Sequence, residues 1–335
     1  MKPVIFGIAG HELTPDERIF FEQADPLGYI LFKRNCGDVA QMKALTDSLR
    51  DLSGRADLPI LIDQEGGRVA RMVPPEWPAF PAGAAFDALY DIAPISAIEA
   101  ARANAQALAM MLGEVGVNVN CAPLLDVRQA DVTPAIGDRS FGGDPMRVAA
   151  LGQAMLEGMR RGGVVGVVKH MPGHGRALVD SHYDLPHVKA DAAALEMDLE
   201  PFARLNGAPM GMTCHVVFEA WDAERPATLS PRVISEIIRG RIGFDGLLMT
   251  DDIDMKALSG TAGEKASLAL AAGCDVVLDC WARMDEMVEI AGLIGDATPE
   301  CLARLDRAMA TIADGSAAAD FGALIAKRDE LLALA

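Results

Sequence analysis

The sequence predicts an α/β protein, specifically a (β/α)8 TIM-like barrel. Short apolar runs recur eight times along the chain, with helical patterns between them. Polar residues follow five of these runs on the C-terminal side, and in a barrel those strand ends converge on one mouth. An open doubly wound sheet uses similar units but would place the strand ends in a line along one crevice. Convergence from five strands therefore favours the barrel.

The eight expected strands are short apolar segments bounded by turn residues. The most informative one, 162–168, is almost wholly apolar and β-branched, which suits a strand covered on both faces. Lys169 and His170 follow where such a strand leaves its sheet, and Met-Pro-Gly then stops it. The other expected strands are 4–9, 28–33, 58–62, 117–125, 209–214, 246–249 and 275–278.

Helical patterns fill the segments between these runs. Thr14 is the expected N-cap of a helix over 15–24, and Asp38 is the expected cap of an amphipathic helix that ends near 52. A Pro-rich loop, 74–81, leads into one Ala-rich helix that ends near 112. Further helices are expected over 145–161, 190–205, 231–241, 264–272 and from 284 onward with breaks at Pro299 and Gly315.

Composition limits the classes of function. The chain has 335 residues, of which 51% are hydrophobic, so it can bury a large core, and no linker marks a boundary, so we expect one domain over residues 1–335. The net charge of −18 disfavours nucleic acid or an anionic membrane as a partner. No apolar run reaches the ~18 residues of a membrane span, and the first run is too short for a signal peptide. Six scattered cysteines without a CxxC pair are typical of a reduced, cytoplasmic protein.

Asp251 is a candidate catalytic carboxylate because it directly follows the buried run 246–249. Asp252 stands beside it, and successive strand residues point in opposite directions, so we expect only one of the two to face the mouth. An N-cap together with a surface acid is the simpler interpretation of such a pair. Polar residues also follow other predicted strands, whose C-terminal ends meet at the mouth of the barrel. This shared pattern favours Asp251 as the acid that faces the mouth.

Asp180 and His182 are candidates for acid/base chemistry. They lie two residues apart in a loop of roughly ten residues that follows Gly175. At that spacing a carboxylate can accept a hydrogen bond from an imidazole, which fixes the tautomer and raises the basicity. A solvent-exposed turn fits the spacing equally well. Because loops of this length are often lids, we expect the pair to be mobile.

Charged residues near strand ends three to five are candidates for ligand binding. Lys169, Arg71 and Arg139 can hold a hydroxylated or acidic ligand, and Asp63 can accept two sugar hydroxyls. The alternative is a set of structural ion pairs, with Asp63 satisfied by Arg68 or a backbone amide.

Metal and nucleotide sites are not expected. His170, His174 and His182 suggest a metal site, but no ligand spacing such as HExxH is present. The glycine pairs form neither GxGxxG nor a P-loop. We therefore expect no metal and no cofactor.

The sequence contains six distinctive blocks, which are 169–175 (KHMPGHG), 180–182 (DSH), 62–71 (IDQEGGRVAR), 137–141 (GDRSF), 250–252 (TDD) and 255–257 (MKA). Together these blocks resemble the family 3 glycoside hydrolases, and among them the β-N-acetylglucosaminidases of peptidoglycan recycling. The chain departs from the family pattern at Thr250, where Ser is frequent, and at 253–255. Neither of these two changes removes a functional group, although Asp254 adds a charge. In addition, Cys280 replaces an Asn that is common after strand eight.

The resemblance implies a single-domain barrel that removes terminal non-reducing N-acetylglucosamine from β-linked saccharides with retention. At the matching positions Asp251 is the nucleophile, and His182 is the acid/base on a mobile loop, assisted by Asp180. A histidine–aspartate pair then replaces the second carboxylate of an ordinary retaining glycosidase. The positions that hold the sugar are Asp63, Arg71, Arg139, Lys169 and His170.

The expected partner is a saccharide or muropeptide substrate, and we expect a monomer. A histidine base tolerates an anionic acceptor, so phosphorolysis is an alternative to hydrolysis. A sugar-binding barrel without catalysis would need neither Asp251 nor His182. A metal-dependent hydrolase on the same fold would be sensitive to chelators.

Overall fold

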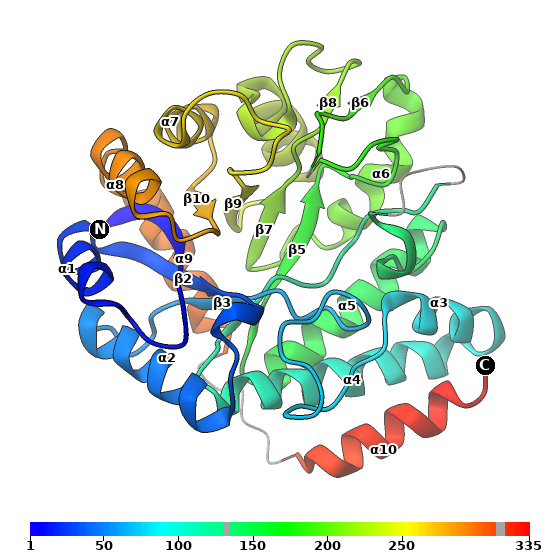
Figure 1. Ribbon diagram of the computed structural model, residues 1–335. Coiled ribbons are helices and arrows are strands. Elements are labelled where there is room, and N and C mark those ends of the chain that lie inside the picture. The colour runs from blue at the N-terminus through cyan, green and yellow to red at the C-terminus, as the bar shows by residue number, and fades with distance from the viewer. Residues whose placement is uncertain (130–134, 182, 313–318) are drawn as a thin grey trace.

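The computed structural model describes residues 1–129, 135–181, 183–312 and 319–335. Its centre is a closed barrel of parallel strands in the order β1-β10-β9-β7-β5-β4-β3-β2. Helices surround this barrel on the outside (Figure 1). The predicted (β/α)8 barrel is therefore confirmed, and the open sheet is excluded.

Each of the eight predicted runs supplies one barrel strand. An additional pair, β6 (His187–Val188) and β8 (Val217–Phe218), forms a separate two-stranded sheet. It was not predicted, because two residues carry no periodic signal. The barrel strands are β1 (Lys2–Gly7), β2 (Pro26–Leu31), β3 (Ile60–Ile62), β4 (Val119–Asn120), β5 (Val165–Met171), β7 (Met210–Thr213), β9 (Leu247–Asp252) and β10 (Val276–Asp279).

Both predicted N-caps are present. Thr14 precedes α1 (Pro15–Ala24) and accepts a hydrogen bond from the Glu17 amide at 3.1 Å, while the Glu17 carboxylate accepts from the Thr14 amide at 2.8 Å. Asp38 accepts from the Gln41 amide at 2.8 Å at the start of α2 (Val39–Ser53). These bonds satisfy amide groups that the first helical turn leaves without a partner.

The predicted Ala-rich helix is two helices, α3 (Gly83–Ile92) and α4 (Pro94–Glu114). Between them Ala93 has φ −146° and ψ 81°, because a residue before proline is disfavoured in the helical region. The segment predicted as a helix over 231–241 is a π-helix, η4 (Val233–Ile242). The remaining α-helices are α5 (Pro145–Arg161), α6 (Ala192–Arg204), α7 (Ala262–Ala272), α8 (Met284–Leu293), α9 (Pro299–Ala310) and α10 (Phe321–Leu332).

The C-terminal helices occupy different places on the barrel. The predicted break at Pro299 is confirmed as the start of α9, while the break predicted at Gly315 lies outside the described residues. Cys301 and Leu305 of α9 pack with barrel-interior residues such as Ile5 and Val165. Because the Cys301 thiol also contacts the carbonyl of Asp275, just before β10, α9 covers the N-terminal end of the barrel. Helix α10 lies along α4 (Figure 1).

The barrel interior is a packed core rather than a pore, as is usual for this fold. Its inward-facing side chains form one cluster, and the outward-facing side chains pack against the helices in a second, larger cluster. The six cysteines are free thiols. None of the described helices is both long and apolar enough to span a bilayer.

Candidate active site

A cavity of about 570 Å³ lies at the C-terminal ends of the barrel strands. Seven of the eight predicted site residues line it, and the eighth, His182, lies outside the described residues. The structure thus brings residues that are far apart in the sequence to one site. The seven are Asp63, Arg71, Arg139, Lys169, His170, Asp180 and Asp251.

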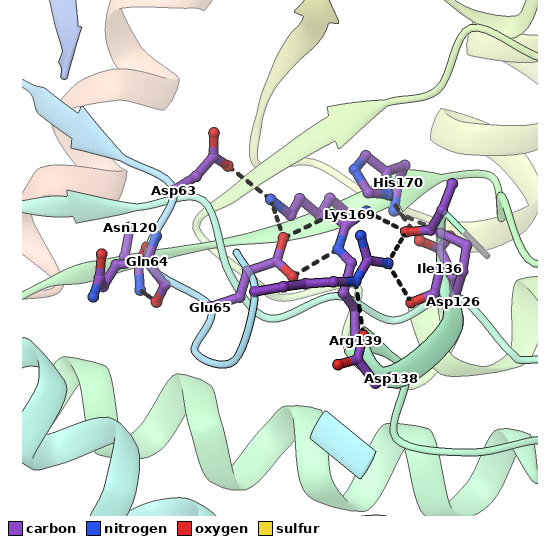
Figure 2. Close-up of polar contacts among 12 residues, drawn as sticks. Asp63, Gln64, Glu65, Asn120, Asp126, Ile136, Asp138, Arg139, Lys169 and His170 are labelled. Carbon is purple, nitrogen blue, oxygen red and sulfur yellow. Dashed lines mark hydrogen bonds and ion pairs between the residues drawn. The ribbon is translucent and has the colours of Figure 1, made fainter. Parts of the chain in front are cut away.

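Lys169 is the centre of a buried charge cluster. Its ammonium lies 2.9 Å from a carboxylate oxygen of Asp63 and 2.7 Å from one of Glu65, and its side chain is 2% exposed. Burial alone would lower the pKa of Lys169, but the two carboxylates outweigh burial and raise it above its ordinary value. Figure 2 shows both carboxylates directed at the Lys169 ammonium. A buried cation is stable only with such partners, so Lys169 is charged in this site.

Two arginines complete the charge cluster. Arg71 contacts the second oxygen of Asp63 at 3.1 Å. Arg139 binds Glu65 through two parallel contacts, Nε at 2.9 Å and Nη2 at 2.7 Å. Burial opposes ionisation of Asp63, yet Lys169 and Arg71 keep its pKa below the usual value. Arg68, the alternative partner considered for Asp63, pairs instead with Asp138 at 2.8 Å.

Glu65 is a site residue that sequence reasoning did not single out. The two-residue spacing from Asp63 after β3 was the available signal, because alternate residues of an extended segment share a side. Its partner Arg139 was predicted to hold the sugar. The structure places the Arg139 guanidinium on the cavity wall with one edge bound to Glu65.

Asp126, in the segment that follows β4, fixes His170. Its Oδ2 lies 2.8 Å from Nδ1 of His170 (Figure 2). Its Oδ1 accepts from the backbone amide of His174 at 2.6 Å. Burial alone would raise the pKa of Asp126, but His170 and the His174 amide hold it below the usual range. An ionised Asp126 therefore accepts a hydrogen bond from Nδ1–H of His170 and leaves Nε2 of that imidazole for a ligand. Asp126 directly follows the predicted strand 117–125 and was not among the predicted site residues.

Asp251 lines the cavity at the end of β9. One of its carboxylate oxygens accepts from the Asp252 amide at 2.8 Å. Burial opposes its ionisation, but the nearby His170 and His215, together with that amide, lower the pKa of Asp251 below its ordinary value. Asp251 is therefore ionised at neutral pH, which a carboxylate nucleophile requires.

Asp252 has a different environment from Asp251. It accepts from the amides of Asp254 at 3.2 Å and Cys280 at 3.3 Å, as expected for an acid that supports its neighbours. Burial raises the pKa of Asp252 to about 6. The expectation that only one of the two acids faces the mouth is wrong, because both line the cavity. The register between β9 and β10 shifts near this strand end, so simple alternation does not hold there.

The segment that carries Asp180 is attached to the barrel through Ser181. The Ser181 hydroxyl lies 3.3 Å from Nε2 of His174, and the Ser181 carbonyl accepts from the Ala257 amide at 3.3 Å. Ser181 is 3% exposed. Burial lowers the pKa of His174 to about 4, so this imidazole is neutral at physiological pH. The predicted bond between Asp180 and His182 lies outside the described residues.

Among residues 1–129, 135–181, 183–312 and 319–335, no group of three or more His, Cys, Asp or Glu side chains is arranged to hold a metal ion. The cluster at Lys169 instead presents cations, carboxylates and an imidazole to the cavity. Such groups suit the hydroxyls of a sugar, because they offer both donors and acceptors in one pocket.

Comparison with known proteins identifies the family to which this chain belongs. The model of the glycosyl hydrolase family 3 N-terminal domain matches residues 22–314. The chain belongs to glycoside hydrolase family 3. It is 38% identical to a β-hexosaminidase of Chromobacterium violaceum, over 98% of this chain and 91% of that protein.

Solved structures agree with the family assignment. NagZ from Neisseria gonorrhoeae in complex with N-trifluoroacetyl-D-glucosamine has a TM-score of 0.87 and 31% identity, over 99% of this chain and 98% of that one. A family 3 β-N-acetylglucosaminidase from Paenibacillus has a TM-score of 0.86 and 31% identity, over 98% of this chain and 67% of that one. The predicted class, a glycoside hydrolase of the β-N-acetylhexosaminidase type, is confirmed by these matches.

Proposed function

We propose that this family 3 protein is a retaining exo-β-N-acetylglucosaminidase with Asp251 as its nucleophile. One observation carries the proposal. The ionised Asp251 opens to the same cavity as the Asp63–Lys169 pair, His170 and the loop that holds Asp180. A terminal sugar held by the cluster thus has an ionised carboxylate beside it, and the segment that carries Asp180 lines the same cavity.

The reaction needs two displacements at the anomeric carbon. In the first, an Asp251 oxygen forms a bond to that carbon while the glycosidic bond breaks, and His182 gives its proton to the leaving oxygen. In the second, His182 takes a proton from water, the water oxygen bonds to the anomeric carbon, and the bond to Asp251 breaks. Two inversions give net retention. Asp180 stabilises the imidazolium state of His182.

The remaining residues of the cavity hold the sugar. Asp63 presents carboxylate oxygens to hydroxyl groups, and Lys169 and Arg71 keep that carboxylate ionised. His170 offers Nε2 because Asp126 occupies Nδ1. These groups act on the substrate before and during the reaction, so their loss is expected to raise KM as well as lower kcat.

The packed barrel interior supports the proposed exo mode of attack. Side chains fill its interior below the cavity, and α9 covers the far end, so a saccharide cannot thread through it. A chain end enters the pocket, and the rest of the saccharide stays at the mouth. This supports removal of one terminal non-reducing residue at a time.

Peptidoglycan fragments are the proposed natural substrate, namely N-acetylglucosamine linked β-1,4 to anhydro-N-acetylmuramic acid and its peptide derivatives. The chain carries a net charge of −18, yet Arg34, Arg68 and Lys256 all line the cavity. Such local cations suit the carboxylates of a muropeptide leaving group. We accordingly propose a role in cell-wall recycling in the cytoplasm, the compartment to which the free thiols point.

The test is an assay with a chromogenic β-N-acetylglucosaminide. We expect the first product, monitored by NMR, to be the β-anomer of N-acetylglucosamine. We also expect the Asp251→Asn variant to lose nearly all turnover. Phosphate in the assay distinguishes hydrolysis from phosphorolysis, since phosphorolysis gives the sugar 1-phosphate. An α-anomer as first product, or equal turnover by both proteins, contradicts the proposal.

A further inference from the structure

One wall of the cavity is a continuous row of stacked cationic and aromatic side chains. The guanidinium carbon of Arg71 lies 5.0 Å from the centroid of the Phe32 ring, and that of Arg34 lies at the same distance from the same ring. Arg34 also lies 6.0 Å from the ring centroid of Trp281. All four residues line the cavity. We call them the Arg–aromatic row.

The row connects the sugar-holding cluster to the mouth of the cavity. At its inner end Arg71 is bound to Asp63 at 3.1 Å, and at its outer end Trp281 follows β10 and is 56% exposed. The other two tryptophans, Trp77 and Trp221, are 5% and 6% exposed. An exposed indole at the rim of a pocket offers an apolar ring face and a polar N–H to a ligand.

Arg34 is fixed in place and gives Trp281 a rigid neighbour. Its Nε donates to the carbonyl of Ile8 at 2.8 Å, and its Nη2 donates to the carbonyl of Cys280. These bonds tie the ends of β1, β2 and β10 together around the guanidinium. A preformed surface loses little conformational entropy when a ligand stacks on it.

The backbone next to Trp281 is held in an unusual conformation. Ala282 has φ 56°, in the left-handed region that costs an L-residue ~1–2 kcal/mol. The next residue, Arg283, is anchored to Asp254 and to Glu286, the latter at 2.6 Å. Strain that surrounding contacts maintain next to a cavity is a sign of function. Here the turn sets the position of Trp281.

We propose that Trp281, supported by Arg34, is the stacking platform for the leaving-group sugar and selects substrates with a second pyranose ring. The inference rests on the proposed exo-glycosidase function. With the terminal sugar at the Asp63 end of the row, the next ring lies toward the Trp281 end. The C–H face of a pyranose is weakly positive and apolar, so it is attracted to the negative face of an indole.

The test compares two substrates that differ in the leaving group. N,N′-diacetylchitobiose releases a second sugar ring, whereas N-acetylglucosaminyl azide releases a small anion without a ring. Trp281→Ala, Trp281→Phe and the surface control Ile95→Ala are assayed for kcat/KM on both, after circular dichroism has verified folding. Ile95 is 84% exposed on α4, and the structure does not place it in the cavity.

We expect Trp281→Ala to lower the chitobiose-to-azide ratio of kcat/KM about tenfold, Trp281→Phe to restore much of the ratio, and Ile95→Ala to leave it unchanged. As a second measurement, chitobiose added to Asp251→Asn protein should change the tryptophan fluorescence, and the change should be lost with Trp281→Phe. An unchanged ratio in Trp281→Ala overturns the inference while the proposed function stands. A wild-type protein that cleaves neither substrate overturns the proposed function itself.

Discussion

Asp126 Oδ2 and His170 Nδ1 lie 2.8 Å apart, and both side chains are almost entirely buried. The pair makes His170 dependent on a carboxylate that does not itself line the cavity. Because a carboxylate accepts and cannot donate when ionised, the contact selects one tautomer of the imidazole. The orientation of His170 is thus fixed before any ligand binds.

Replacing Asp126 with Asn tests that dependence. The amide keeps the shape but loses the charge, so Nδ1 of His170 loses its charged acceptor, a contact worth ~1.5–3 kcal/mol. We expect kcat/KM to fall about 10- to 100-fold. The measurement is steady-state kinetics with a pH profile. A profile identical to that of the wild type in shape and height would show that Asp126 does not position His170.

Lys169→Met is expected to destabilise the protein as well as inactivate it. Without the ammonium, Asp63 and Glu65 are left as two adjacent buried carboxylates, and breaking a buried ion pair costs ~3–5 kcal/mol. Urea unfolding measures the change. The matched control is Lys43→Met, in an exposed pair with Asp47, where the free energy of unfolding should change by less than ~0.5 kcal/mol. Equal effects of the two substitutions would contradict the buried cluster.

Stability should decrease as pH rises from about 4 to about 7 because of Asp279. Burial raises the pKa of Asp279 to about 7, and one of its buried oxygens has no hydrogen-bond partner among the described residues. An aspartate in the unfolded chain titrates near pH 3.8. Between that pH and about 7, Asp279 is protonated in the folded state but ionised in the unfolded state, so the folded state loses relative stability as the pH rises and Asp279 loses its proton. Asp252, with its pKa raised to about 6, acts in the same direction.

Asp279→Asn removes that penalty. We expect the variant to be more stable than the wild type at pH 8, by on the order of 2 kcal/mol, with the difference vanishing near pH 4. The pKa values of Asp63, Asp126 and Asp251 are lowered, so the stability that these carboxylates contribute is lost only as the pH falls below the ordinary pKa range of an aspartate. They therefore do not mask the effect of Asp279 at higher pH. A difference that is constant with pH would show that Asp279 does not titrate there.

Ser181→Ala should release the loop that carries Asp180 and His182. The lost bond to His174 is worth ~0.5–1.5 kcal/mol, so we expect kcat to fall about three- to tenfold with little change in unfolding temperature. The matched control is Ser48→Ala on α2, whose hydroxyl donates to the Leu45 carbonyl in the preceding helical turn at 2.8 Å. If kcat is unchanged in Ser181→Ala, the His174–Ser181 contact does not position the loop.

The strands were predictable because each apolar run is buried on both faces by a barrel core and a helical layer. The break at Ala93 was missed although the sequence carries its signal, because Pro94 cannot continue a helix but can occupy the first turn of a new one. By contrast, β6 and β8 are too short to leave a pattern.

Within the site, sequence patterns located the strand-end residues but not their partners. Asp63 and Lys169 follow recognisable strands, whereas the pairing of Glu65 with Arg139 spans 74 residues and that of Asp126 with His170 spans 44. Such contacts depend on barrel closure, which no local pattern encodes. Trp281 gave no signal either, because a single aromatic after a strand is ordinary in sequence.

The nucleophile can be identified directly by trapping the intermediate. A 5-fluoro-N-acetylglucosaminyl fluoride slows both displacements and lets the glycosyl-enzyme accumulate, so that peptide mass spectrometry locates the modified residue. We predict one sugar per chain, attached to Asp251 and absent from Asp251→Asn protein. A sugar attached to Asp252, Asp63 or any other side chain, or a protein that turns over without ever carrying one, would contradict the account.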